Sequence, residues 1–109
     1  MTGLEAFGAL DLRVGRILSA EPLAGARKPA YKLSVDLGPL GVKGSSAQIT
    51  DLYGPGDLVG RRVVCAVNLG ARRIAGFVSE VLVLGAPDDA GRVVLLAVER
   101  DVPLGGKVF

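Results

Sequence analysis

Residues 31–60 read YKLSVDLGPLGVKGSSAQITDLYGPGDLVG and contain several successive elements. Polar and apolar side chains alternate over residues 31–37, which predicts a half-buried strand, and residues 42–49 predict another strand, rich in small polar residues. Gly38–Gly41 between them predicts a tight turn. Residues 50–60 are broken by Pro and Gly and predict a loop with one helical turn. A short helical insertion directly after a strand is typical of small Greek-key barrels.

The segments on either side of this stretch supply the remaining elements. Thr2 can cap a short helix over residues 3–10, and residues 11–20 alternate as a half-buried strand with Gly15 as a candidate bulge or bend. Apolar runs rich in β-branched residues predict buried strands at Val63–Leu69, Val78–Leu84 and Val93–Val98. We therefore predict an all-β OB-fold, a five-stranded Greek-key barrel in a single domain over residues 1–109. The C-terminal strand extension is not needed for the barrel and is expected to serve dimerisation.

The composition predicts an assembly of two chains. Half of the 109 residues are hydrophobic, only 5% are aromatic, and Trp is absent. A small domain cannot hide so much apolar surface alone, so we expect a homodimer. No apolar run reaches the roughly 18–20 residues that span a bilayer, and the N-terminus does not read as a signal peptide. We therefore expect no membrane insertion and a cytoplasmic location. The lone cysteine, Cys65, lies inside an apolar run and is predicted to be buried.

The residue types that are missing argue against catalysis. The chain has no histidine and a single cysteine, which excludes His-based nucleophilic machinery, His metal sites and thiolate zinc sites. The acidic residues do not pair into a catalytic arrangement, because Asp88 and Asp89 follow Pro87 and read as a hairpin turn. We predict a protein that is not an enzyme and that uses no cofactor and no metal.

Residues 68–85, NLGARRIAGFVSEVLVLG, carry a candidate binding surface. A glycine-bearing loop with Arg72 and Arg73 joins two apolar runs, next to Asn68 and a Ser-Glu pair at residues 79–80. Guanidinium groups match the oxygens of phosphate, so this loop can bind a phosphate-rich partner. Taken alone, an arginine pair in a loop is more often a solvated turn, and that alternative stays open.

Several motifs resemble the tRNA-binding domain family, which includes free-standing tRNA-binding proteins and appended domains of some methionyl- and tyrosyl-tRNA synthetases. They are DLRVG at residues 11–15, YKL at 31–33, VDLG at 35–38 and NL at 68–69. KGSSAQIT at 43–50 and AGFVSEVLVLG at 75–85 are similar, more narrowly, to the CsaA-type protein-export chaperones. The resemblance implies an OB-fold homodimer whose C-terminal strands contribute to the interface. It also implies two activities, which are binding unfolded or presecretory polypeptides and recognising the shape of tRNA.

The two activities use overlapping side chains. In a chaperone, Phe77 and nearby aliphatic residues would contact clients, cations would hold acidic client segments, and Ser or Gln side chains would bond client backbone. In a tRNA-binding protein, the arginines would contact phosphates while polar side chains read 2′-hydroxyls or base edges. The candidate RNA- or peptide-binding residues are Lys43, Ser45, Ser46, Gln48, Asn68, Arg72, Arg73, Phe77, Ser79 and Glu80.

Structural roles compete with these assignments. Phe77 and Ile74 can equally fill the barrel, and Glu80 can pair with Arg72 or Arg73 and order the loop. We expect a CsaA-type chaperone of export clients that also binds tRNA, with the export translocase as a candidate partner. The alternative functions are a dedicated, structure-specific tRNA-binding protein and a structural protein that bridges subunits.

Overall fold

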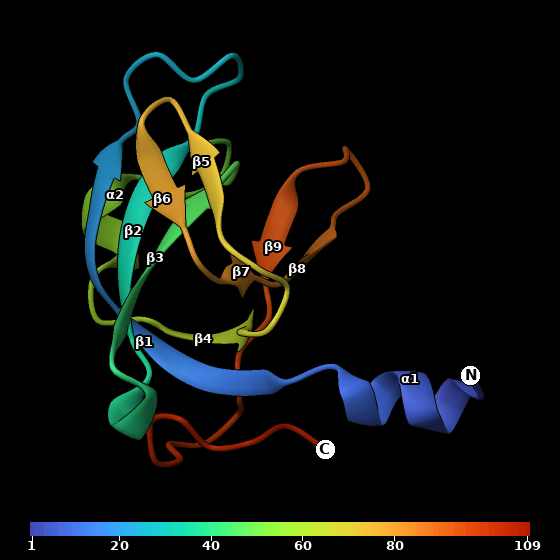
Figure 1. Ribbon diagram of the computed structural model, residues 1–109. Helices are drawn as coiled ribbons and strands as arrows, with labels where there is room; N and C mark the ends of the chain where they lie inside the picture. The colour runs from blue at the N-terminus through green and yellow to red at the C-terminus, as the bar shows by residue number, and fades with distance from the viewer.

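The computed structural model describes all 109 residues and contains a nearly closed barrel of five antiparallel strands (Figure 1). The strands lie in the order β3-β2-β1-β4-β7, and two short hairpins, β5–β6 and β8–β9, are added to them. The elements are α1 (Gly3–Ala9), β1 (Leu12–Pro22), β2 (Tyr31–Asp36), η1 (Gly38–Leu40), β3 (Val42–Ala47), α2 (Pro55–Leu58), β4 (Arg62–Ala66), β5 (Arg72–Ile74), β6 (Phe77–Ser79), β7 (Leu82–Val83), β8 (Gly85–Pro87) and β9 (Val93–Leu95). The predicted OB-fold with a short N-terminal helix is confirmed.

The barrel is filled by apolar side chains from alternate positions of its strands. Ile17, Val35 and Val63 have no exposed surface, and Leu58 of α2 closes the same cluster. Burying a side chain of this size contributes about 1.5–3 kcal/mol relative to leaving it exposed. Cys65 is also fully buried, as predicted, and this burial raises the pKa of its thiol to about 12.

The register irregularity in β1 lies after the predicted position. Gly15 pairs in register with Val63, whereas the register with β2 shifts between Ile17 and Ser19. The prediction of a bulge at Gly15 is therefore wrong. This glycine is needed for close packing instead, because a Cβ there would lie 2.5 Å from Cγ1 of Val35.

The region predicted as one strand at Val78–Leu84 is divided into two. Residues 77–79 pair with β5 in the first hairpin, and Leu82–Val83 pair with β4. Val81 between them turns into the core and is buried. The other two predicted strands are shorter than expected, because β4 ends at Ala66 and β9 ends at Leu95. Only β4 is buried: β9 has no buried residue, so the prediction of a buried strand at Val93–Val98 is wrong.

The two ends of the chain differ in how they meet the barrel. Thr2 and Glu5 form a reciprocal capping box on α1, which buries none of its own residues and projects from the barrel (Figure 1). The C-terminal tail docks along β1, with hydrogen bonds from Val14 N–H to the Gly106 carbonyl at 3.0 Å and from Val108 N–H to the Leu12 carbonyl at 2.9 Å. None of the helices is long and apolar enough to span a membrane.

Candidate functional site

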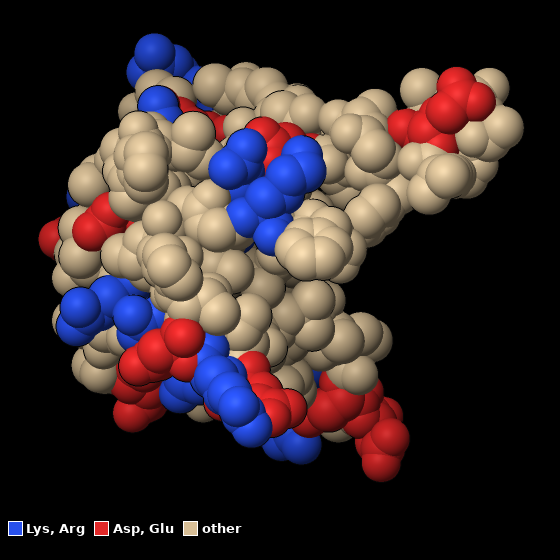
Figure 2. Space-filling model, turned by 90° about the horizontal axis from the view of Figure 1, so that it is seen from below, with Lys and Arg blue, Asp and Glu red and all other residues tan.

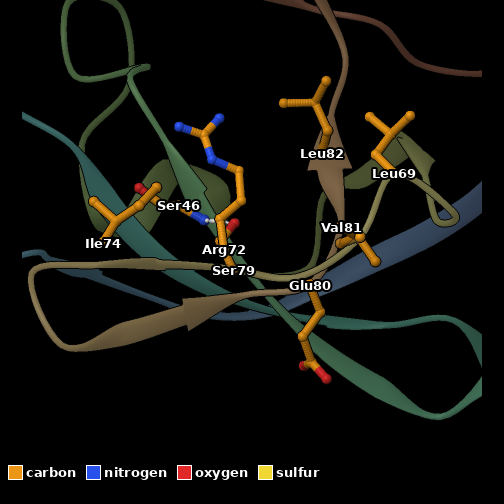
Figure 3. A pocket seen from close by; sticks show the side chains of 9 residues that line it. Ser46, Leu69, Arg72, Ile74, Ser79, Glu80, Val81 and Leu82 are labelled. Carbon is orange, nitrogen blue, oxygen red and sulfur yellow. Dashed lines mark hydrogen bonds between the residues drawn. The ribbon is translucent and has the colours of Figure 1, made fainter.

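A groove of about 520 Å³ opens between the β1–β2 loop, the edge strand β3 and the β5–β6 hairpin. Its polar and charged lining residues are Arg27 and Lys28 from the loop, Ser46 and Gln48 from β3 and its end, and Arg72 from β5. A second hollow of about 250 Å³ shares Ser46, Arg72 and Ile74 with it and continues to Leu69 and Leu82 (Figure 3). We call the two together the hairpin groove. The corresponding strand face and loops of OB-folds bind oligonucleotides and oligosaccharides.

The β5–β6 hairpin forms one wall of the groove because of its turn. Ala75 and Gly76 both have positive φ, 50° and 81°, which is the conformation of a two-residue turn that matches the twist of the strands. Successive side chains of β5 point to opposite faces, so Arg72 and Ile74 line the groove while Arg73 does not. The guanidinium of Arg73 instead lies near the turn, 3.4 Å from the Gly76 carbonyl.

The cations of the groove have no acidic partners. Six of the 13 Lys and Arg residues form salt bridges, and none of these six is Arg27, Lys28 or Arg72. By contrast, on the lower face of the molecule in Figure 2, Lys and Arg side chains lie next to Asp and Glu side chains. The groove therefore presents uncompensated positive charge to an anionic ligand.

Ser79 and Glu80 fasten the base of the hairpin to β3. The Gly44 N–H donates to Oε2 of Glu80 at 2.9 Å, and the Ser46 N–H donates to Oγ of Ser79 at 3.0 Å. In return, the backbone N–H of Glu80 donates to the Gly44 carbonyl at 2.8 Å. In Figure 3 the carboxylate of Glu80 points away from Arg72. The predicted pairing of Glu80 with Arg72 or Arg73 is therefore wrong, and Glu80 forms no ion pair with a cation of the groove.

Comparison with known proteins agrees with this arrangement. A family model described as a tRNA-binding domain matches residues 12–107, which is almost the whole chain. The chain belongs to the tRNA-binding domain family.

Two solved chaperone structures are similar to this tRNA-binding domain over their full lengths. The CsaA chaperone from Bacillus anthracis is 50% identical, with a TM-score of 0.92 over 100% of this chain and 99% of that chain. The CsaA chaperone protein from Picrophilus torridus is 40% identical, with a TM-score of 0.93 over all of both chains. These matches confirm the predicted resemblance to CsaA-type proteins.

Curated relatives include much longer enzymes. The methionine–tRNA ligase of Methanocaldococcus jannaschii is 40% identical over 105 residues, which are 91% of this chain but only 15% of the ligase. The chain therefore corresponds to a small part of that ligase.

The tRNA-binding domain brings about half of the predicted site residues together. Ser46, Gln48 and Arg72 line the larger part of the groove, and Ser79 and Glu80 line the smaller part. Of these five, Ser79 and Glu80 already use side-chain oxygens to hold β3. Their contribution to the groove is therefore first of all structural.

Other predicted residues lie elsewhere. Ser45 points into the barrel and is fully buried, so its side chain cannot contact a ligand without rearrangement. Asn68 accepts a hydrogen bond from the Asp11 N–H and donates one to the Ala9 carbonyl, both at 2.8 Å, and so joins the end of α1 to the β4–β5 connection. Lys43 and Asn68 line another hollow of about 330 Å³, which shares Glu80 and Val81 with the smaller part of the groove.

Phe77 belongs neither to the barrel core nor to the hairpin groove. It is half-buried on the outer side of the sheet, where a Cβ on Gly44 would lie 2.9 Å from Cζ of its ring. Because neither Phe77 nor Ile74 is in the core clusters, the alternative that both fill the barrel is wrong. Ile74 instead supplies apolar surface to the groove.

Sequence reasoning did not place Arg27 and Lys28 in the site. These two cations lie in the β1–β2 loop, on the opposite side of the groove from Arg72. The signal available in the sequence was a basic pair just before Pro29, in the loop between the first two strands. That loop is one of the two ligand-binding loops of OB-folds, so the fold prediction itself could have indicated them.

Proposed function

We propose that this protein binds tRNA in the hairpin groove, with phosphate groups held by Arg27, Lys28 and Arg72. The observation that supports this most directly is the convergence of three cations without acidic partners on one groove of the OB-fold ligand face. Arginine forks match phosphate oxygens, and lysine adds a mobile point charge. Family membership supports tRNA as the nucleic acid.

The polar residues that line the groove determine which parts of an RNA it can recognise. Ser46 and Gln48 offer hydroxyl and amide groups beside the cations, suited to ribose 2′-hydroxyls or exposed base edges. No aromatic ring lines the groove, so bases have no stacking platform there. We therefore expect recognition of the RNA backbone and its shape, with little preference for base sequence.

A second function, chaperoning of unfolded or presecretory polypeptides for export, is supported by the full-length similarity to two CsaA chaperones. Leu69 and Leu82 are about half exposed at one end of the groove, next to Ile74. These apolar side chains are suited to contacting a client segment, while the cations hold its acidic residues. The protein would bind presecretory clients in the cytoplasm and would transfer them to the export translocase.

The chain is proposed to act as a homodimer. Large apolar side chains are exposed on two projections from the barrel, with Leu4 and Phe7 on α1 and Val94 and Leu96 on or next to β9. Figure 1 shows α1 and the β8–β9 hairpin leaving the barrel on the same side. A second copy that covers these surfaces would remove the exposed apolar area.

The salt dependence of binding separates the two functions. Each phosphate contact contributes roughly 0.7–0.9 to the slope of log affinity against log salt. Changing Arg27 and Arg72 together to Ala should therefore lower the tRNA slope by roughly 1.4–1.8, which corresponds to about a 25- to 60-fold weaker affinity at 0.1 M salt. Arg92→Ala, which removes a cation that is paired with Asp88 away from the groove, is the matched control and should change neither quantity. An unchanged slope in the double variant would exclude the groove as the RNA site.

Client binding should respond to different changes. An unfolded polypeptide held mainly by Leu69, Ile74 and Leu82 should depend less on salt than tRNA does, and its binding should weaken in Leu82→Ser. Leu82 is half exposed, so this change is not expected to unfold the barrel. If Leu82→Ser leaves the affinity for an unfolded model polypeptide unchanged, the apolar end of the groove is not the client site.

A further inference from the structure

Three arginines gather on another part of the surface, where β1 meets the segment that follows α2. Arg16 of β1 and Arg62 of β4 are direct cross-strand partners, so their side chains emerge on the same face of the sheet. Arg61 precedes Arg62, and the guanidinium of Arg16 lies over Gly60, with Nη2 3.7 Å from where a Cβ of that glycine would be. None of the three lines the hairpin groove.

The backbone around these arginines is held firmly. The Gly60 N–H donates to the Ile17 carbonyl at 2.7 Å, and the Ile17 N–H donates to the Arg61 carbonyl at 3.0 Å. The guanidinium of Arg61 is stacked over the ring of Tyr53, 5.1 Å from its centroid, and its Nε lies 3.4 Å from the Asp57 carbonyl oxygen. A charged group that is already oriented in this way loses little freedom when it binds a ligand.

The three arginines form only one salt bridge with the acids nearby. Asp57 uses its carboxylate to accept the Gly54 N–H at 2.9 Å and forms no salt bridge. Asp101 lies 3.4 Å from Arg62, but its side chain is 86% exposed, and such a pair contributes little. Arg16 and Arg61 form no salt bridge: Asp36, the cross-strand partner of Arg16 on β2, uses its carboxylate to accept the Gly38 N–H at 2.9 Å. Nε of Arg62 is buried without a hydrogen bond. Arg16 and Arg62 lie directly opposite each other in the sheet, and like charges in that arrangement are destabilising.

We propose that Arg16, Arg61 and Arg62 form a second anion site, and that its ligand is a backbone phosphate of the RNA that the hairpin groove also binds. The choice of RNA rests on the proposed function. Two separate phosphate contacts, one in the groove and one at this cluster, allow the protein to select a folded RNA by shape. A short single strand can fill the groove, but it lacks the fixed shape that would hold a second phosphate at the cluster.

The test uses Arg16→Ala, because the Arg16 side chain makes no hydrogen bond or salt bridge in the structure and its loss should not disturb the fold. Folded tRNA should bind this variant with a salt slope lower by roughly 0.7–0.9 and with about a five- to eightfold weaker affinity at 0.1 M salt. Arg16→Lys, which keeps the charge, should retain the slope of the unaltered protein. Arg100→Ala, an exposed arginine paired only with its neighbour Glu99, is the control and should have no effect.

Two further measurements identify the ligand. A single-stranded RNA of about five nucleotides should bind Arg16→Ala and the unaltered protein equally well. In thermal melts at matched ionic strength, inorganic phosphate should stabilise the unaltered protein more than Arg16→Ala. An unchanged tRNA slope in Arg16→Ala overturns the proposal, and a phosphate effect without a tRNA effect shows that the cluster binds only small anions, which overturns the RNA assignment. If the unaltered protein binds no tRNA, the proposed function fails, and the phosphate melts alone decide whether the cluster is an anion site.

Discussion

Substitution of Gly44 by Ala adds a single methyl group that should push the β5–β6 hairpin away from the barrel. A Cβ at residue 44 would lie 2.8 Å from the carbonyl oxygen of Val78 and 2.9 Å from Cζ of Phe77, whereas ordinary contacts begin at 3.4 Å. The ring of Phe77 can rotate, but the Val78 carbonyl is backbone, so β6 must retreat by 0.6 Å, the difference between 3.4 and 2.8 Å. The bond from the Ser46 N–H to Ser79, now 3.0 Å, would then exceed 3.5 Å and be lost.

The expected cost of Gly44→Ala is about 1–3 kcal/mol, the usual range for overpacking. Urea denaturation should show this as a lower midpoint with an unchanged slope. Because Arg72 is carried by the strand that pairs with β6, the affinity for tRNA should fall as well. The control is Gly56→Ala in α2, where nothing lies within 4 Å of the added methyl group; it should be neutral or stabilise by about 0.4–1 kcal/mol. If Gly44→Ala keeps both its stability and its tRNA affinity, the hairpin is not held on β3 in the way described.

Three other changes test individual side chains. Ser45→Ala removes a buried hydroxyl that has no hydrogen-bond partner, so it should be neutral or stabilise by up to about 1 kcal/mol in a thermal melt, and RNA and peptide affinities should not change. Asn68→Ala removes both bonds between the end of α1 and the barrel and should make residues 1–10 sensitive to limited proteolysis at a stability cost of about 1–2 kcal/mol. Cys65 should react slowly with thiol reagents when native and quickly in denaturant. Folding raises the pKa of the Cys65 thiol from 9.0 to about 12, so its contribution to stability is full below pH 9 and is lost as the pH rises towards 12. Urea unfolding of the unaltered protein and of Cys65→Val, measured over this pH range, should show the difference.

The strands and the N-terminal cap could be predicted because they depend on local patterns. Alternation marked β1 and β2, and the sequence from Thr2 to Glu5 contains a complete capping box. The hairpin was missed for the opposite reason. Residues 78–84 are apolar except for Ser79 and Glu80. Nothing in the local sequence indicates that these two side chains form hydrogen bonds with β3, which lies 33 residues before Ser79 at Ser46 and 36 residues before Glu80 at Gly44.

The same limit applies to the directions of neighbouring side chains. Strand geometry requires that Ser45 and Ser46 point to opposite faces of the sheet, and the same holds for Arg72 and Arg73. Which member faces the ligand depends on the register, and register is normally set by an apolar face. The run Gly44-Ser45-Ser46-Ala47 has only small side chains, so it carries no contrast from which the buried face could be chosen.

The groove exists because the fifth strand of the barrel starts late. If residues 77–83 had continued as one strand along β3, its backbone would have covered the edge of β3. The β5–β6 hairpin would then not form, and the groove between this hairpin and β3 would not exist. Instead, the side chains of Ser79 and Glu80 satisfy the two edge N–H groups of β3 that a strand would otherwise have paired. This substitution frees the preceding residues to fold into a hairpin that carries Arg72 towards Arg27 and Lys28 across the groove. The two residues that interrupt the regular barrel are therefore the ones that both close it and give it a binding surface.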